Sequence, residues 1–222
     1  MSSFVHLGQL DKVADLLAKD DLVLANVKVD WTVSAGGGGA AGPELAAHAA
    51  QMMAEFGLAS DSHRVATQWI DHLSNGAEFD HSRALLLMAA GRWVEAKATL
   101  TKLSETDSDA VVPSRDGRIP RRLRVLGALG VVDARLQLPA EALRIDSLLK
   151  SLGTDAEGGE VEILRARIHA QLGDLEAGVA LADAGRDKGW ELLSLMNSLA
   201  DDHWLVPLRP LPSFQSIIAL KD

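Results

Sequence analysis

The sequence predicts an all-α protein, built as a right-handed α-solenoid of stacked antiparallel helix hairpins. Three segments of the chain, centred on Gly91, Gln137 and Gly173, repeat one pattern. Each carries a small residue on either side of a turn, twelve positions apart, as in Ala84 and Ala96. Small side chains let two helices approach closely, and a recurring helix-turn-helix unit is typical of a solenoid. Leucine and alanine also dominate the apolar residues, as expected where helices pack on helices.

The first 42 residues differ from the rest of the chain. Residues 3–18 carry apolar side chains at helical spacing, so we expect a helix there. Over residues 22–33 apolar and polar residues alternate, which is typical of a strand or a short extended segment. A glycine-rich loop from Gly36 to Gly42 follows. We therefore expect residues 1–42 to form an atypical N-terminal layer.

From Pro43 onward the sequence predicts helices joined by turns. Proline suits the first turn of a helix, glycine suits its end, and aspartate suits its N-cap. These signals stand at Pro120 and Pro139; at Gly91, Gly153 and Gly173; and at Asp61 and Asp174. They divide residues 43–188 into four hairpins, with helices expected at 43–57 and 61–75, 79–90 and 92–104, 120–137 and 139–152, and 157–172 and 174–188.

Residues 189–222 are expected to close the chain as a C-terminal cap, with short helices near 190–200 and 212–220. A solenoid hides the apolar face of its last repeat to stay soluble. Four apolar residues of the tail can do this: Leu208, Phe214, Ile217 and Ile218. We treat residues 1–222 as a single domain.

One long loop, residues 105–118, interrupts the regular spacing. The Glu95-Ala96 and Glu141-Ala142 pairs lie 46 residues apart, and a loop insertion of about twelve residues would reduce that distance to 34. Loops of this length are uncommon unless they are functional or disordered. The sequence leaves open whether this loop is ordered.

The repeated unit resembles the tetratricopeptide repeat over residues 78–188. The framework positions that carry the resemblance are Ala84, Leu87, Trp93, Ala96 and Leu100, then Gly130, Ala142 and Leu149, then Ala166, Leu175 and Gly178. Three polar residues depart from it, because Asp133, Asp146 and His169 stand where the family usually has a large apolar residue. The segment from Trp204 to Ile218 resembles tails that follow such repeats in bacterial regulators. Residues 8–20 resemble the second helix of an ankyrin unit.

Composition and charge exclude several classes of protein. The net charge of −9 argues against nucleic-acid binding, which needs a basic face. The chain has no cysteine, so disulfides and thiolate chemistry are excluded. No apolar run is long enough to span a membrane, and the N-terminus lacks the pattern of a signal peptide. We expect a cytoplasmic protein that binds neither membrane nor nucleic acid.

An alternative interpretation rests on the glycine-rich loop. Gly37, Gly39 and Gly42 have the spacing of a dinucleotide-binding turn, and Asp61 follows nineteen residues later. A run of four glycines generates this pattern by itself, and no second strand precedes the aspartate. A nucleotide-binding enzyme or small-molecule sensor using the loop from Gly36 to Gly42 is therefore the alternative hypothesis.

Five arginines cluster in this acidic chain: Arg115, Arg118, Arg121, Arg122 and Arg124. Arginine at a helix N-terminus opposes the helix dipole, so the cluster needs an explanation. One interpretation is a patch that binds an acidic or phosphorylated partner segment. The other interpretation is a solvated loop with ion pairs to nearby acidic residues such as Glu105. We favour this one, because runs of charged residues usually lie on solvated surfaces.

No histidine pair has the i, i+4 spacing of a helical zinc site, and no nucleophile elbow is present. His169 is expected to be a hydrogen-bonded core histidine. We expect packed positions for the four tryptophans Trp69, Trp93, Trp190 and Trp204, although Trp204 could instead contact a partner.

The sequence thus favours a non-enzymatic bacterial adaptor without metal or cofactor. The groove formed by the first helices of its hairpins would bind a peptide or protein segment.

Overall fold

The computed structural model describes residues 59–73, 80–106, 120–153, 159–190 and 199–219, together with residues 47, 50 and 53. Within these residues every element is a helix, which confirms the all-α prediction. The expected helix at 3–18, the extended segment at 22–33 and the glycine-rich loop lie outside the described residues. No helix in the described ranges is both long and apolar enough to cross a bilayer.

The chain divides into two compact units, Met1–Arg92 and Trp93–Asp222. The boundary falls in the turn of the hairpin predicted over residues 79–104. The pairing of the two helices of that hairpin therefore stays a prediction.

In the first unit, helix α5 (Ala59–His72) packs against helix α6 (Asp80–Ala89). Their shared core contains Val65, Ala66 and Leu86. Near the start of α5, Nδ1 of His63 lies 3.1 Å from the carbonyl oxygen of Ala90, which ties the two helices together.

The N-cap prediction for Asp61 is wrong. Helix α5 begins at Ala59, so Asp61 lies inside the first turn, where its carboxylate accepts a hydrogen bond from Arg64 at 2.9 Å. An acidic residue in the first turn still has a favourable interaction with the helix dipole.

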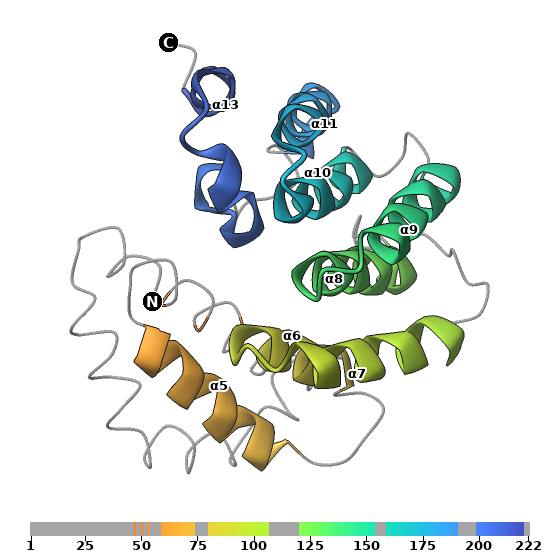
Figure 1. Ribbon diagram of the computed structural model, residues 1–222, viewed down its shortest axis with the longest axis vertical. Coiled ribbons are helices and arrows are strands. Elements are labelled where there is room, and N and C mark those ends of the chain that lie inside the picture. The colour runs from red at the N-terminus through yellow and green to blue at the C-terminus, as the bar shows by residue number, and fades with distance from the viewer. Residues whose placement is uncertain are drawn as a thin grey trace, which may run out of the picture. The chain divides into compact units, whose positions relative to one another are not determined.

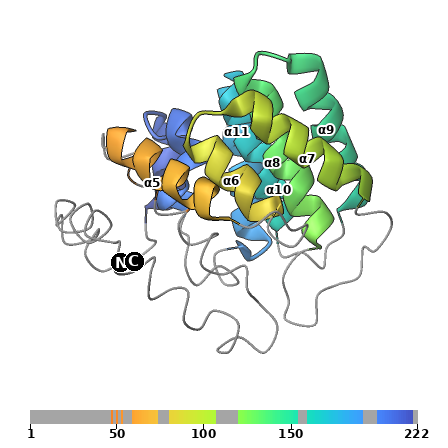
Figure 2. The same ribbon diagram turned by 90° about the horizontal axis from the view of Figure 1, so that it is seen from below.

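The second unit contains five helices whose bounds differ from the predicted ranges by at most three residues. They are α7 (Trp93–Thr106), α8 (Arg121–Arg135), α9 (Pro139–Leu152), α10 (Glu160–Leu172) and α11 (Leu175–Asp187). Helix α8 contacts α7 and α9, and α10 contacts α8, α9 and α11. Helices α7, α8 and α10 follow one another in Figure 1, and they overlap when seen from below in Figure 2. The elements α8–α9 and α10–α11 are thus two successive hairpins.

Three helices end in the same turn. The left-handed residue is Gly91 after α6, Gln137 after α8 and Gly173 after α10, with φ of 70°, 59° and 81°. At each turn this residue donates its amide to the carbonyl three positions back, and the next residue donates to the carbonyl five positions back, at 2.8–3.3 Å. This is the Schellman motif, which satisfies carbonyl groups that a helix end leaves unpaired.

The small residues of the repeated pattern lie in the helix crossings, as predicted. Gly130 is buried, and a Cβ atom there would lie 2.3 Å from Cδ1 of Ile168 on α10. Ala142 and Ala166 are fully buried, and Gly178 lies under Leu208 of the tail. Helices α8, α9, α10 and α11 therefore pack closely because these side chains leave space.

A glycine contact that the sequence pattern did not indicate joins α10 to α11. Gly159 is the N-cap of α10, with a left-handed φ of 84°. A Cβ atom on Gly159 would lie 2.1 Å from the carbonyl oxygen of Gly185 on α11. Only glycine fits this position, because both the backbone angle and the space exclude a side chain.

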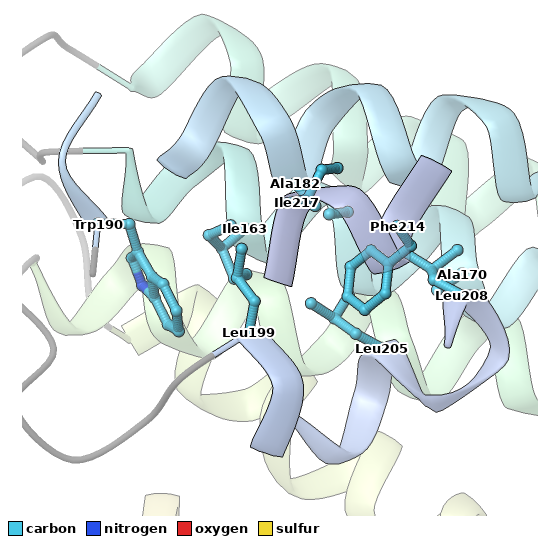
Figure 3. Packing of buried hydrophobic residues seen from close by; sticks show 10 residues of the cluster. Ile163, Ala170, Ala182, Trp190, Leu199, Leu205, Leu208, Phe214 and Ile217 are labelled. Atoms are coloured by element: carbon cyan, nitrogen blue, oxygen red, sulfur yellow. The ribbon is translucent and has the colours of Figure 1, made fainter. Parts of the chain in front are cut away.

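The C-terminal tail covers the last hairpin. It contains the 3₁₀ helices η3 (Leu199–Asp201) and η4 (His203–Leu208) and helix α13 (Pro212–Ile218). Buried residues of the tail and of α10 and α11 form one cluster, in which Phe214 gathers with Leu205 and Leu208 at one end (Figure 3). Leu208, Phe214 and Ile217 are buried and Ile218 packs against them. The role of the tail as the cap of a solenoid stays a prediction. Most of the helix expected at 190–200 lies outside the described residues.

Candidate functional site

The structure places three of the five predicted site arginines on the first turn of α8. Arg121 is exposed, whereas Arg122 and Arg124 are half-buried. Arg115 and Arg118 lie outside the described residues. Pro120, expected in the first turn, is instead the N-cap of α8, and no acidic residue occupies that turn. Nothing in the first turn of α8 itself therefore offsets the positive charge.

Helix α8 is cationic at both ends. It carries four arginines and a single acidic residue, Asp133. Asp133 is buried and forms an ion pair at 2.8 Å with Lys97 of α7, so its charge is neutralised from a neighbouring helix. Helix α8 thus carries more arginines than carboxylates, in a chain whose net charge is −9.

One face of α8 presents most of this charge. At about 100° per residue, four residues of the helix fall within a sector of about 60°, and these residues are Arg121, Arg124, Ala128 and Arg135. Arg121 and Arg135 are exposed, and Arg124 and Ala128 are half-buried. We call this set the arginine face of α8.

The far end of the arginine face lies against tryptophan. The guanidinium of Arg135 lies 5.1 Å from the centre of the Trp93 ring on α7. Trp93 in turn contacts Trp204 of η4 edge to face, with 6.2 Å between ring centroids, and His203 lies 4.6 Å from Trp204. We call Trp93, Arg135, His203 and Trp204 the tryptophan cluster. It joins three elements that are distant in the sequence.

Polar contacts from α10 hold Trp204 in place. Nε of Arg167 donates to Oδ2 of Asp202 at 2.8 Å, and Oδ1 of Asp202 accepts from the backbone amide of Trp204 at 2.9 Å. Nε2 of Gln171 also donates to the carbonyl oxygen of Trp204 at 2.7 Å. Trp204 is buried, as the packing interpretation expected. Because Trp204 is fixed to α10, it presents a stable edge to Trp93.

Arg124 and Arg135 differ from the other cations near the cluster. Lys97 pairs with Asp133 and Arg167 pairs with Asp202, so these cations are compensated. Arg135 contacts the Trp93 ring and forms no ion pair with any residue that the structure describes. Nε of Arg124 is buried and has no hydrogen-bond partner within the same residues. The exposed charge of Arg135 is therefore not compensated by any carboxylate that the structure describes.

A second polar cluster lies between α9, α10 and the turn before α11. Arg165 makes two hydrogen bonds to Asp146, from Nε at 2.8 Å and from Nη2 at 3.2 Å. The ring of His169 lies between two carboxylates, 3.4 Å from Asp146 and 3.0 Å from Asp174. This confirms His169 as a hydrogen-bonded core histidine. We call these four residues the aspartate–histidine network.

Asp174 occupies the predicted N-cap position of α11, but its side chain makes no capping hydrogen bond. Its carboxylate contacts His169 instead. The polar residues that depart from the repeat pattern, Asp133, Asp146 and His169, all have partners in the structure. They link neighbouring helices, and no serine or threonine hydroxyl belongs to the network.

Sequence reasoning missed Arg135, Lys97, Arg167 and Asp202. Asp133 was the available signal of a cationic partner on a neighbouring helix, because a buried carboxylate needs a nearby cation. The glycine-rich loop from Gly36 to Gly42 lies outside the described residues. In the part of the chain that is described, no three histidine, aspartate or glutamate residues are arranged to hold a metal ion.

Comparisons of the chain with protein-family models, with curated proteins and with solved structures find no match.

Proposed function

We propose that the chain is a non-enzymatic adaptor: an α-solenoid similar to tetratricopeptide arrays, which binds a peptide or protein segment along the first helices of its hairpins. We propose that this adaptor acts in the cytoplasm of a bacterium, as the sequence suggests.

The register between the two hairpins of the second unit carries the proposal. The left-handed residues Gln137 and Gly173 are 36 positions apart. The buried small residues keep the same spacing, from Gly130 to Ala166 and from Ala142 to Gly178. A constant spacing of turn and crossing residues is what stacked repeats require.

The contacts between the hairpins also support stacking. The first helices α8 and α10 contact each other, and α9 contacts α10. The tail then packs on α10 and α11 through η4 and α13. Repeats stacked in this way generate a continuous surface from their first helices, and such surfaces bind extended segments or helices.

The proposal is tested with a photo-crosslinking amino acid at Ala128 of α8, compared with the same residue at Ser147 of α9. Ala128 lies on the arginine face, and Ser147 is exposed on the second helix of the hairpin. We expect irradiation in a native lysate to give a defined protein adduct from position 128 and none from position 147.

Equal adducts at both positions, or adducts only at position 147, would place binding elsewhere and contradict the proposal.

A panel of nucleotides added in a thermal-shift assay tests the alternative hypothesis. A saturable shift with one nucleotide would favour the enzyme or sensor.

A further inference from the structure

We infer that the arginine face of α8 binds an acidic segment of a partner protein through side-chain carboxylates. This inference rests on the proposed function and names the chemistry of its partner.

Charge complementarity is the first argument. Helix α8 concentrates four arginines in a chain of net charge −9, and a neighbouring helix neutralises its only acidic residue. An acidic chain gains nothing in solubility from such a helix, whereas a carboxylate-rich ligand is attracted to it.

The second argument is that Arg135 is already oriented. Its guanidinium is held over Trp93, which limits the number of side-chain conformations, and the residue is exposed. A guanidinium stacked on an aromatic ring still has N–H groups at its edge, and these match the two oxygens of a carboxylate. Preorganisation of this kind lowers the entropy lost on binding.

The third argument is the unused donor of Arg124. Its Nε is buried and lacks a partner among the described residues. Because Nε is buried, a ligand would contact Arg124 through the exposed part of its half-buried side chain. Ala128 lies between Arg124 and Arg135 on the same face, and it is half-buried.

Arg135 also lies in the last turn of α8, where a cation stabilises the helix through its dipole. A purely structural role would therefore explain its presence without any ligand. The experiment needs a binding readout as well as a folding readout to separate these two roles.

The spacing of the arginines defines the probe. Arg121 and Arg135 are fourteen residues apart on one helix, which is about 21 Å. In an extended peptide, two glutamates six positions apart are separated by about 20 Å. The probe is a fluorescein-labelled, C-amidated heptapeptide with glutamate at both ends and alanine and leucine between them. Its control has glutamine at both ends.

Fluorescence anisotropy of the full chain is expected to show saturable binding of the glutamate peptide and none of the glutamine peptide. Raising the salt concentration should weaken the binding. Arg135→Gln should weaken it about tenfold, as expected for the loss of one charge-assisted contact. Arg144→Gln is the matched control, because Arg144 is an exposed arginine on α9.

Equal binding of both peptides, equal effects of the Arg135 and Arg144 variants, or no saturable binding would overturn the inference. The partner identified by crosslinking distinguishes failure of this inference from failure of the proposed function. If that partner binds equally to wild type and to the Arg124→Gln/Arg135→Gln double variant, the adaptor function is retained. The inference that the arginine face binds acidic segments is then wrong. Circular dichroism of each variant checks that the helices remain folded.

Discussion

Asp146 and Arg165 form a two-point ion pair that joins α9 to α10, with both oxygens of the carboxylate engaged. Their side chains are only 11% and 15% exposed. Asp146 stands at a position where the repeat pattern would place an apolar residue. The pair therefore fixes how one hairpin contacts the next through geometry that an apolar side chain would not impose.

Replacing Asp146 by alanine should destabilise the second unit by about 3 kcal/mol, because it leaves the charge of Arg165 buried without its partner. Denaturant unfolding followed by circular dichroism measures the loss. Lys150→Ala on the same helix is the control, since Lys150 is exposed and its loss should change stability by less than about 0.5 kcal/mol. The double variant Asp146→Leu/Arg165→Met should recover much of the loss. Strict additivity of its two single effects would contradict this explanation.

Gly159 and Gly173 provide a matched pair for separating backbone strain from steric overlap. Their φ angles are nearly equal, at 84° and 81°. A Cβ at Gly159 would lie 2.1 Å from the Gly185 carbonyl oxygen, whereas a Cβ at Gly173 meets no atom within 4 Å. Gly173→Ala should therefore destabilise by about 1 kcal/mol, through left-handed strain alone.

Gly159→Ala should destabilise by about 3 kcal/mol, because overlap with the backbone of α11 adds to the same strain. Thermal unfolding of both variants under one set of conditions gives the comparison. Similar losses in stability for the two variants would show that α10 and α11 do not approach as closely at Gly159 as the structure has them.

Gln137 is the one residue other than glycine with a positive φ among the residues that the structure describes. The equivalent turns use Gly91 and Gly173. Gln137→Gly should stabilise the second unit by about 0.5 kcal/mol, since removal of left-handed strain exceeds the added entropy of glycine in the unfolded chain. Gln137→Ala keeps the strain and should give no gain. A loss of stability in the glycine variant, measured by urea unfolding, would contradict this expectation.

The sequence was sufficient to predict the helices because local signals mark their ends. Pro139 begins α9 and Gly173 ends α10, as expected. The N-cap prediction at Asp61 was wrong because an acidic residue is favourable both at the N-cap and in the first turn. Spacing alone cannot distinguish these two positions.

The candidate site was predicted only in part. Arg121, Arg122 and Arg124 are adjacent in the sequence, so their clustering was evident. Arg135 joins their face only because of helical geometry, and its contact with Trp93 depends on the packing of α8 against α7. The ion pair of Arg167 with Asp202 links residues 35 positions apart, and such pairs follow from tertiary structure rather than from local pattern.

The tail should contribute to stability through Phe214, which is fully buried against the last hairpin. Phe214→Ala should destabilise the second unit by about 3–5 kcal/mol, because it removes a large apolar side chain and leaves a cavity. The variant should also bind an apolar fluorescent dye more strongly, since loosening of the tail exposes the apolar residues of α10 and α11. Val206→Ala, at a residue of the same tail that is 38% exposed, should change neither property appreciably. Wild-type stability and dye binding in the Phe214 variant would show that the last hairpin stays folded without the tail packed against it, and the capping role would then be wrong.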